Sequence, residues 1–252
     1  MLSQGNQKPD RQCTSPGSVL LDLWVSARGS VSLWLVSVCT VTFLAVGLLA
    51  AAKTVARGQA IGLMGLSWVG VFQRLWLHQF LTAPLMHGGV VHLLFNMLSL
   101  GMLGPEVEKA MGRGRYAAFS LLCAECSMIG FLAFNWGTGN IVVGYSGVIF
   151  GILVAQAVFF PNNRVAIFGL FPLKMKHAAA LLAAVELYLT IAPEGAGIAH
   201  AAHLFGALAA VVYLKGPGWL RAGRVRAATP ANHACVKRPA RVKIKDQIPR
   251  EL

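Results

Sequence analysis

Residues 31–52 read VSLWLVSVCTVTFLAVGLLAAA, an unbroken apolar run that follows a polar stretch. At about 1.5 Å per residue, a helix of this length crosses the roughly 30 Å hydrocarbon core of a bilayer. The run is too long for the apolar region of a signal peptide, and no convincing cleavage site follows it. It therefore predicts a transmembrane helix.

The composition of the whole chain agrees with a membrane location. Its 252 residues are 56% hydrophobic and only 12% charged, with a mean hydropathy of +0.62. An ordinary soluble domain carries about 25% charged residues, so this chain cannot cover itself with a water-compatible surface. Glycine shows no period and five cysteines are too few for a disulfide scaffold, which excludes collagen-like and disulfide-rich proteins. We expect a polytopic membrane protein.

Five further apolar runs follow the first along the chain. They predict an all-α bundle of six transmembrane helices with the bounds Val31–Ala52, Val90–Leu103, Tyr116–Asn135, Ser146–Phe160, His177–Ile191 and Ile198–Leu214. The second helix can continue for a turn or two through the polar sequence GPEVEK. The segment 53–89 is long and rich in aromatic residues, which predicts a first loop that lies in the membrane interface. The helical core is expected over residues 31–215.

The net charge of +13 is unevenly placed along the chain. Ten of the 22 Lys and Arg residues follow residue 214, so we expect residues 216–252 to form a flexible basic tail. If the N-terminal segment 1–30 and the tail are both inside, 19 Lys and Arg lie inside and three outside. This predicts cytoplasmic termini, most readily at a bacterial plasma membrane. It also predicts a tail that contacts anionic lipid headgroups, and no nucleic-acid partner.

Polar residues inside apolar spans are costly and mark candidate functional positions. His92 and Asn96 are four residues apart, so a helix presents both on one face; a simple hydrogen-bonding pair across the bundle is the alternative. Ser146 follows a glycine-rich stretch and begins its predicted helix. It can simply cap that helix, but its hydroxyl also lies beside unpaired backbone N–H groups, which stabilise an oxyanion.

The predicted helix that starts at Ser146 is short for a membrane span. Its 15 residues, Ser146–Phe160, measure about 22 Å, which is about 8 Å less than the hydrocarbon core. If the inner end reaches the membrane surface, Ser146 lies below the outer surface. Irregular backbone at that depth must be buried in protein or line water. We therefore expect a recessed aqueous cavity at Ser146.

Small residues four apart occur in two of the predicted spans: Gly147 and Gly151 in the fourth, and Ala202, Gly206 and Ala210 in the sixth. Such series let helix backbones approach closely in membranes. If the two series meet, His203 comes near Ser146, and Phe150 packs against the imidazole. A hydroxyl, an imidazole and oxyanion donors in one cavity are the requirements of nucleophilic hydrolysis.

The segments LMHGGVVHLLFNMLSLGMLGPEVEKAMG, GYSGVIFG and AHLFGAL, in this order, resemble the rhomboid family of intramembrane serine proteases over roughly residues 70–215. The resemblance implies a six-helix core that cuts transmembrane segments near the outer membrane face with a Ser–His dyad and no acidic third member. It implies Ser146 as the nucleophile and His203 as the base. The oxyanion donors would be His92, Asn96 and the Ser146 N–H.

Three positions depart from the family pattern. The Trp-Arg pair usual in the first loop is His78-Gln79 here, so the anchoring of that loop is expected to differ. Phe150 stands where the family often has Tyr, and Ala210 stands where the last span often has a second Gly. None of these departures removes a catalytic group.

Two other functions remain open. One is a catalytically inactive rhomboid-like protein that binds or escorts transmembrane segments, although such proteins usually lack the serine or the histidine. The other is a small transporter or channel that uses intramembrane His and Glu residues, although the sequence shows no internal repeat. Nothing in the sequence calls for a metal or a cofactor.

Several other ionisable residues fall in or near the spans. We interpret His200 as part of the cavity mouth, because the HxxG spacing to Gly206 favours His203 as the base. Glu125 and Glu186 are each expected to have an interhelical hydrogen-bond partner or to be protonated. Structural roles are expected for His87 at the loop-to-span corner, for Glu108 as an acceptor for backbone N–H groups of the inner loop, and for Cys123 and Cys126.

Overall fold

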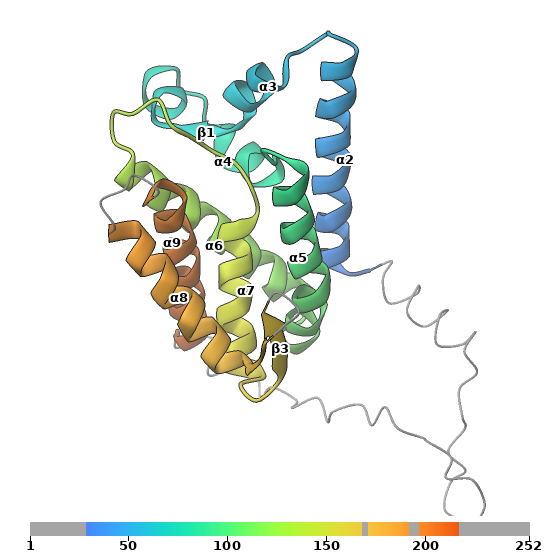
Figure 1. Ribbon diagram of the computed structural model, residues 1–252, viewed down its shortest axis with the longest axis vertical. Coiled ribbons are helices and arrows are strands. Elements are labelled where there is room, and N and C mark those ends of the chain that lie inside the picture. Colours follow the sequence, from blue (N-terminus) through green and yellow to red (C-terminus); the bar gives the residue numbers. More distant parts are fainter. Residues whose placement is uncertain (1–28, 168–170, 192–196, 217–252) are drawn as a thin grey trace, which may run out of the picture.

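The computed structural model describes residues 29–167, 171–191 and 197–216, and this part of the chain is mostly helical (Figure 1). Nearly all of the predicted basic tail and of the predicted N-terminal segment lie outside the described residues. The helices are α2 (Val31–Ala51), α3 (Arg57–Met64), α4 (Gln79–Thr82), α5 (Val90–Met111), α6 (Arg113–Phe134), α7 (Ser146–Phe159), α8 (Met175–Ile191) and α9 (Gly197–Lys215). The strands are β1 (Leu66–Ser67), β2 (Ile141–Val142), β3 (Arg164–Ile167) and β4 (Phe171–Lys174).

Helices occur at all the positions where the apolar runs predict spans. Among the described residues, α2, α5 and α6 are long and apolar enough to cross a membrane, while α7 and residues 200–215 of α9 are shorter apolar helices. The apolar side chains of α2 are largely exposed, as expected of a helix in contact with lipid. The chain is an integral membrane protein, and the number of its crossings remains a prediction.

The expectation of an all-α fold is wrong in two places. Strands β1 and β2 pair antiparallel, with Leu66 opposite Val142. Strands β3 and β4 form an antiparallel pair in the segment between the fourth and fifth predicted spans. Helix α5 does continue through the GPEVEK sequence, because Leu100, Gly104, Val107 and Met111 extend one buried face past Pro105. Only Gly112, whose φ of 84° suits glycine, separates α5 from α6.

Helix α9 packs against α6, α7 and α8 on one side of the bundle (Figure 1). Its contact with α7 is made by backbone. A Cβ added at Gly206 would lie 2.7 Å from the carbonyl carbon of Gly147, and one added at Gly151 would lie 3.4 Å from the carbonyl oxygen of Gly206. The two small-residue series therefore face each other, which brings the start of α7 beside α9.

Glu108, near the C-terminal end of α5, fixes the start of α2. Its carboxylate accepts hydrogen bonds from the Val31 N–H at 2.8 Å and from the Ser32 N–H at 3.0 Å. The hydroxyls of Ser30 and Ser32 donate to it as well, at 2.8 and 3.0 Å. Glu108 thus accepts backbone N–H groups as expected, but the donors belong to the first turn of α2, where such groups have no intrahelical acceptor.

Residues 53–89 fold around one buried amide, that of Gln79. Its Oε1 accepts from the Ser67 N–H at 3.2 Å, and its Nε2 donates to the carbonyls of Gly62 and Leu63. His78 also contacts the Leu63 carbonyl, at 3.0 Å. The His78-Gln79 pair therefore anchors this loop through hydrogen bonds to backbone groups. Because β1 pairs with β2, the loop is joined to the segment that leads into α7.

Candidate functional site

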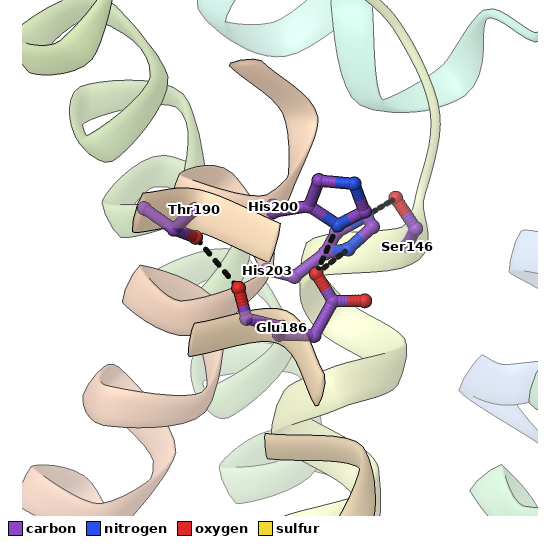
Figure 2. A network of polar contacts seen from close by, with 5 residues as sticks. All are labelled: Ser146, Glu186, Thr190, His200 and His203. Carbon is purple, nitrogen blue, oxygen red and sulfur yellow. Dashed lines mark hydrogen bonds and ion pairs between the residues drawn. The ribbon is translucent and has the colours of Figure 1, made fainter. Parts of the chain in front are cut away.

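Ser146 and His203 lie in hydrogen-bond contact. Ser146 is the first residue of α7 and His203 belongs to the first half of α9. The distance from His203 Nε2 to Ser146 Oγ is 2.8 Å (Figure 2). The backbone contact of Gly147 with Gly206 brings the two helices close enough for this pairing.

Phe150 fixes the plane of the His203 ring. The two rings are stacked, with centroids 4.6 Å apart and an interplanar angle of 11°. Phe150 is one turn after Ser146 on α7, so the helix that provides the hydroxyl also orients the imidazole. The loss of the hydroxyl that a Tyr would carry leaves this stacking intact.

The serine and the histidine open into a cavity of about 290 Å³. His92 and Asn96 on α5 line the same cavity, together with Phe150. Asn96 is buried, and its Nδ2 donates to the carbonyl of His92 at 2.9 Å. An amide nitrogen has two hydrogens, so one remains for a second acceptor.

Gly144 allows the His92 ring to lie beside the segment that leads into α7. A Cβ at Gly144 would lie 2.6 Å from Cε1 of His92, and its φ of 117° is one that other residues rarely adopt. The Gly144 N–H donates to the carbonyl of Ala83 at 3.0 Å, which fixes this turn against the first loop. The turn places the Ser146 N–H at the N-terminus of α7. There the N–H has no intrahelical acceptor and lies at the positive end of the helix dipole.

An acidic side chain lies beside the histidine, which the resemblance to the family did not lead us to expect. Glu186 on α8 lies with its Oε2 3.0 Å from Nδ1 of His203 and 2.6 Å from Nδ1 of His200 (Figure 2). The contact with His203 is an ion pair by distance but lacks hydrogen-bond geometry, and among the described residues that Nδ1 has no hydrogen-bond partner. The reason is the packing of α8 against α9, which turns Glu186 toward both rings.

Sequence reasoning singled out Glu186 as unusual without identifying what it touches. Its expected interhelical partner is confirmed and is His200 on α9. His200 therefore faces the carboxylate, while the contact with Ser146 belongs to His203. Glu125 differs, because its Oε1 has no hydrogen-bond partner in the part of the chain described here.

His87 and the cysteines have structural surroundings. His87 is buried at the corner before α5, where its Nδ1 contacts the Leu85 carbonyl at 3.3 Å. Burial, reinforced by the neighbouring His92, lowers the pKa of His87 to about 4, so this ring is neutral at physiological pH. Cys123 is a buried thiol in the core between α6 and α7, and Cys126 is half-buried.

Comparison with known proteins supplies the family context for this geometry. The family model for the Rhomboid domain matches residues 73–216. Rhomboid-like protein 15 of Arabidopsis thaliana is 27% identical over 58% of this chain and 38% of its own length. Rhomboid-related protein 4 of Rattus norvegicus is 31% identical over 54% of this chain and 45% of its own.

A bacterial relative is named as a protease. Rhomboid protease GlpG of Pectobacterium atrosepticum is 31% identical over 53% of this chain and 46% of its own length. This chain thus spans less than half the length of each of these three relatives. The matched region includes the start of α7 and all of α9, which carry the Ser146–His203 pair.

Proposed function

The chain belongs to the rhomboid family, and on that premise we propose that it is an intramembrane serine endopeptidase that cleaves transmembrane segments near the outer membrane face. The observation that carries this proposal is the 2.8 Å contact between His203 Nε2 and Ser146 Oγ in a cavity beside α5. A hydroxyl with a positioned base is an activated nucleophile, and a cavity of about 290 Å³ leaves room for a peptide segment.

The proposed reaction passes through an acyl-enzyme. Ser146 Oγ attacks the scissile carbonyl carbon and its proton moves to His203 Nε2. The negative charge that develops on the carbonyl oxygen is stabilised by the Ser146 N–H, Asn96 Nδ2 and His92. The C–N bond then breaks as His203 gives its proton to the leaving amine. Water hydrolyses the acyl group, with His203 again accepting a proton.

Two groups support His203 in this role. Phe150 holds the plane of its ring, and the Glu186 carboxylate lies beside its Nδ1. An anion at this position stabilises the imidazolium that forms during attack. We therefore propose Ser146 and His203 as the catalytic pair, with Glu186, Phe150, Gly147 and Gly206 as positioning residues.

The substrate must expose a peptide bond inside the membrane. A transmembrane helix satisfies all of its backbone groups internally, so the segment has to unwind locally before Ser146 can reach a carbonyl. We expect helix-weakening residues near the outer end of such substrates.

The membrane arrangement completes the proposal. We infer six crossings over residues 31–215, with residues 1–30 and the basic tail 216–252 in the cytoplasm, as the excess of Lys and Arg on that side supports. The tail would contact anionic headgroups, and a bacterial plasma membrane is the proposed location. The packing of the short helices α7 and α9 inside the bundle supports the six-crossing count.

A fluorophosphonate probe tests the proposed nucleophile directly. Such probes phosphonylate a serine that an adjacent base activates. We expect the purified protein in detergent to label once per chain, with mass spectrometry locating the adduct at Ser146. The same preparation in proteoliposomes should cleave a single-pass substrate. Absence of both labelling and cleavage would favour an inactive protein that binds transmembrane segments.

Replacing Glu186 with Gln tests the contribution of the carboxylate. The change keeps the side-chain shape but removes the charge 3.0 Å from His203 Nδ1. We expect kcat to fall about tenfold, equivalent to about 1.4 kcal/mol, with little change in KM, because the charge acts mainly on the transition state. Glu125→Gln is the matched control, since that carboxylate lines a different cavity from the one that holds Ser146 and His203. An unchanged kcat in Glu186→Gln would remove Glu186 from the catalytic account.

A further inference from the structure

Three metal-ligating side chains converge between α8 and α9, next to the catalytic serine. Glu186 Oε2 lies 2.6 Å from His200 Nδ1 and 3.0 Å from His203 Nδ1. One ligand atom from each residue lies within 4.8 Å of the others. The Thr190 hydroxyl bonds the backbone carbonyl of Glu186, not its side chain (Figure 2). The carboxylate therefore faces the two imidazoles.

We propose that Glu186, His200 and His203 bind a divalent transition-metal ion of the Zn²⁺ class, and that this ion switches the protease off. The binding half of the proposal needs only the three side chains. The inhibitory half rests on the proposed function, because it requires His203 to be the base.

The donor set suits this class of ion. Two imidazole nitrogens and one carboxylate oxygen form a common protein environment for Zn²⁺, with a fourth position left to water. Metal–ligand bonds of about 2.0–2.1 Å in a tetrahedron place the ligand atoms about 3.3 Å apart. The separations of 2.6 and 3.0 Å are slightly shorter, so a small outward shift of the carboxylate admits the ion. Mg²⁺ and Ca²⁺ prefer oxygen ligands and fit less well.

The local structure presents these atoms in a suitable way. His200 and His203 are three residues apart on α9, so they lie on one face, and Glu186 reaches them from α8. All three side chains are partly or largely buried, with exposures of 21%, 16% and 11% for His200, His203 and Glu186. Among the described residues, His203 Nδ1 is a buried atom without a hydrogen-bond partner, which a metal ion would satisfy.

Metal binding at Nδ1 is incompatible with general-base catalysis. A neutral imidazole carries one proton on one of its two nitrogens. When Nδ1 coordinates the ion, the proton resides on Nε2, the atom that faces Ser146 at 2.8 Å. Nε2 then donates to the hydroxyl and cannot accept its proton. The ion therefore blocks the first proton transfer without occupying the substrate cavity.

Zn²⁺ binding to the Ser146→Ala protein tests the first half of the proposal independently of proteolysis. We expect equilibrium dialysis in detergent to give one tightly bound Zn²⁺ per chain. His200→Ala in the same background should weaken binding at least tenfold, because it removes one ligand. His177→Ala is the matched control, since this exposed histidine of α8 is not part of the cluster. Equal affinity in the His200→Ala and control proteins would overturn the site.

Inhibition of the enzyme with an intact serine tests the second half. We expect Zn²⁺ to stop both substrate cleavage and fluorophosphonate labelling, with full recovery on adding a chelator. The concentration for half-inhibition should rise at least tenfold in His200→Ala, with each variant normalised to its own rate without metal. Binding that depends on His200 but leaves the rate unchanged would overturn the switch alone. A protein that binds Zn²⁺ yet never cleaves or labels would overturn the proposed function and leave the metal site standing.

Discussion

Replacing Ser146 or His203 with alanine is expected to abolish cleavage of a transmembrane substrate, with a loss in kcat of at least about 10⁴-fold. When two residues act as a unit in proton transfer and nucleophilic attack, an enzyme that lacks either one loses nearly all of its activity. Ser146→Ala removes the nucleophilic oxygen, and His203→Ala removes the atom 2.8 Å from it. The measurement is the cleavage rate of a single-pass substrate in proteoliposomes, followed by gel densitometry.

The folds of both variants should survive, which separates catalysis from stability. Ser146 follows the capping residue Tyr145 and caps nothing with its side chain, so its loss costs the helix little. Both proteins are expected to keep the wild-type circular dichroism spectrum and melt within a few degrees of wild type. Cleavage by Ser146→Ala at more than a trace of the wild-type rate would disprove the nucleophile assignment. His177→Ala serves as a histidine control, because its side chain is exposed on α8.

Replacing Gly206 with alanine is expected to damage both the fold and the activity. The added Cβ would lie 2.7 Å from the carbonyl carbon and 3.1 Å from the Cα of Gly147. Both are backbone atoms that cannot rotate away, so α7 and α9 must separate. Overpacking of this kind costs about 1–3 kcal/mol of folding free energy. A displacement of about 1 Å between nucleophile and base lowers the rate about 100-fold. Thermal unfolding in detergent and the cleavage rate measure the two effects.

Gly101→Ala provides a matched control for this substitution. Gly101 lies in the middle of α5, and a Cβ added there meets nothing within 4 Å among the described residues. Since alanine is the better helix former, this variant should be as stable as wild type or slightly more so. Wild-type melting and wild-type activity in Gly206→Ala would contradict the close backbone contact between α7 and α9.

The sequence predicts what depends on spacing within one helix. The glycine series in α7 and the small residues of α9 mark two helix faces whose backbones can pack closely together. The contact of Ser146 with His203 is therefore predictable from the sequence. The stacking of Phe150 follows in the same way, since it lies one turn from Ser146.

The sequence does not fix contacts that depend on how a third helix is rotated. Glu186 reaches His203 only because α8 packs with that face toward α9, and the weak periodicity of α8 does not specify which neighbour this face meets. The pair β3–β4 is not predicted either, because short apolar runs that contain proline are ambiguous. The anchoring role of Gln79 is also not predictable from the sequence, because it depends on three backbone groups, distant in sequence, that meet at its amide.

The pairing of β1 with β2 means that the position of Ser146 depends on a remote part of the chain. Ser67 is held opposite Ile141, and the turn at Gly144 bonds the carbonyl of Ala83, so both restraints fall within five residues of Ser146. Evolution can therefore retune the reach of the hydroxyl by altering side chains some 60–80 positions upstream, leaving every reacting group untouched. Enzymes that share this core would then differ in rate or selectivity through variation at their periphery.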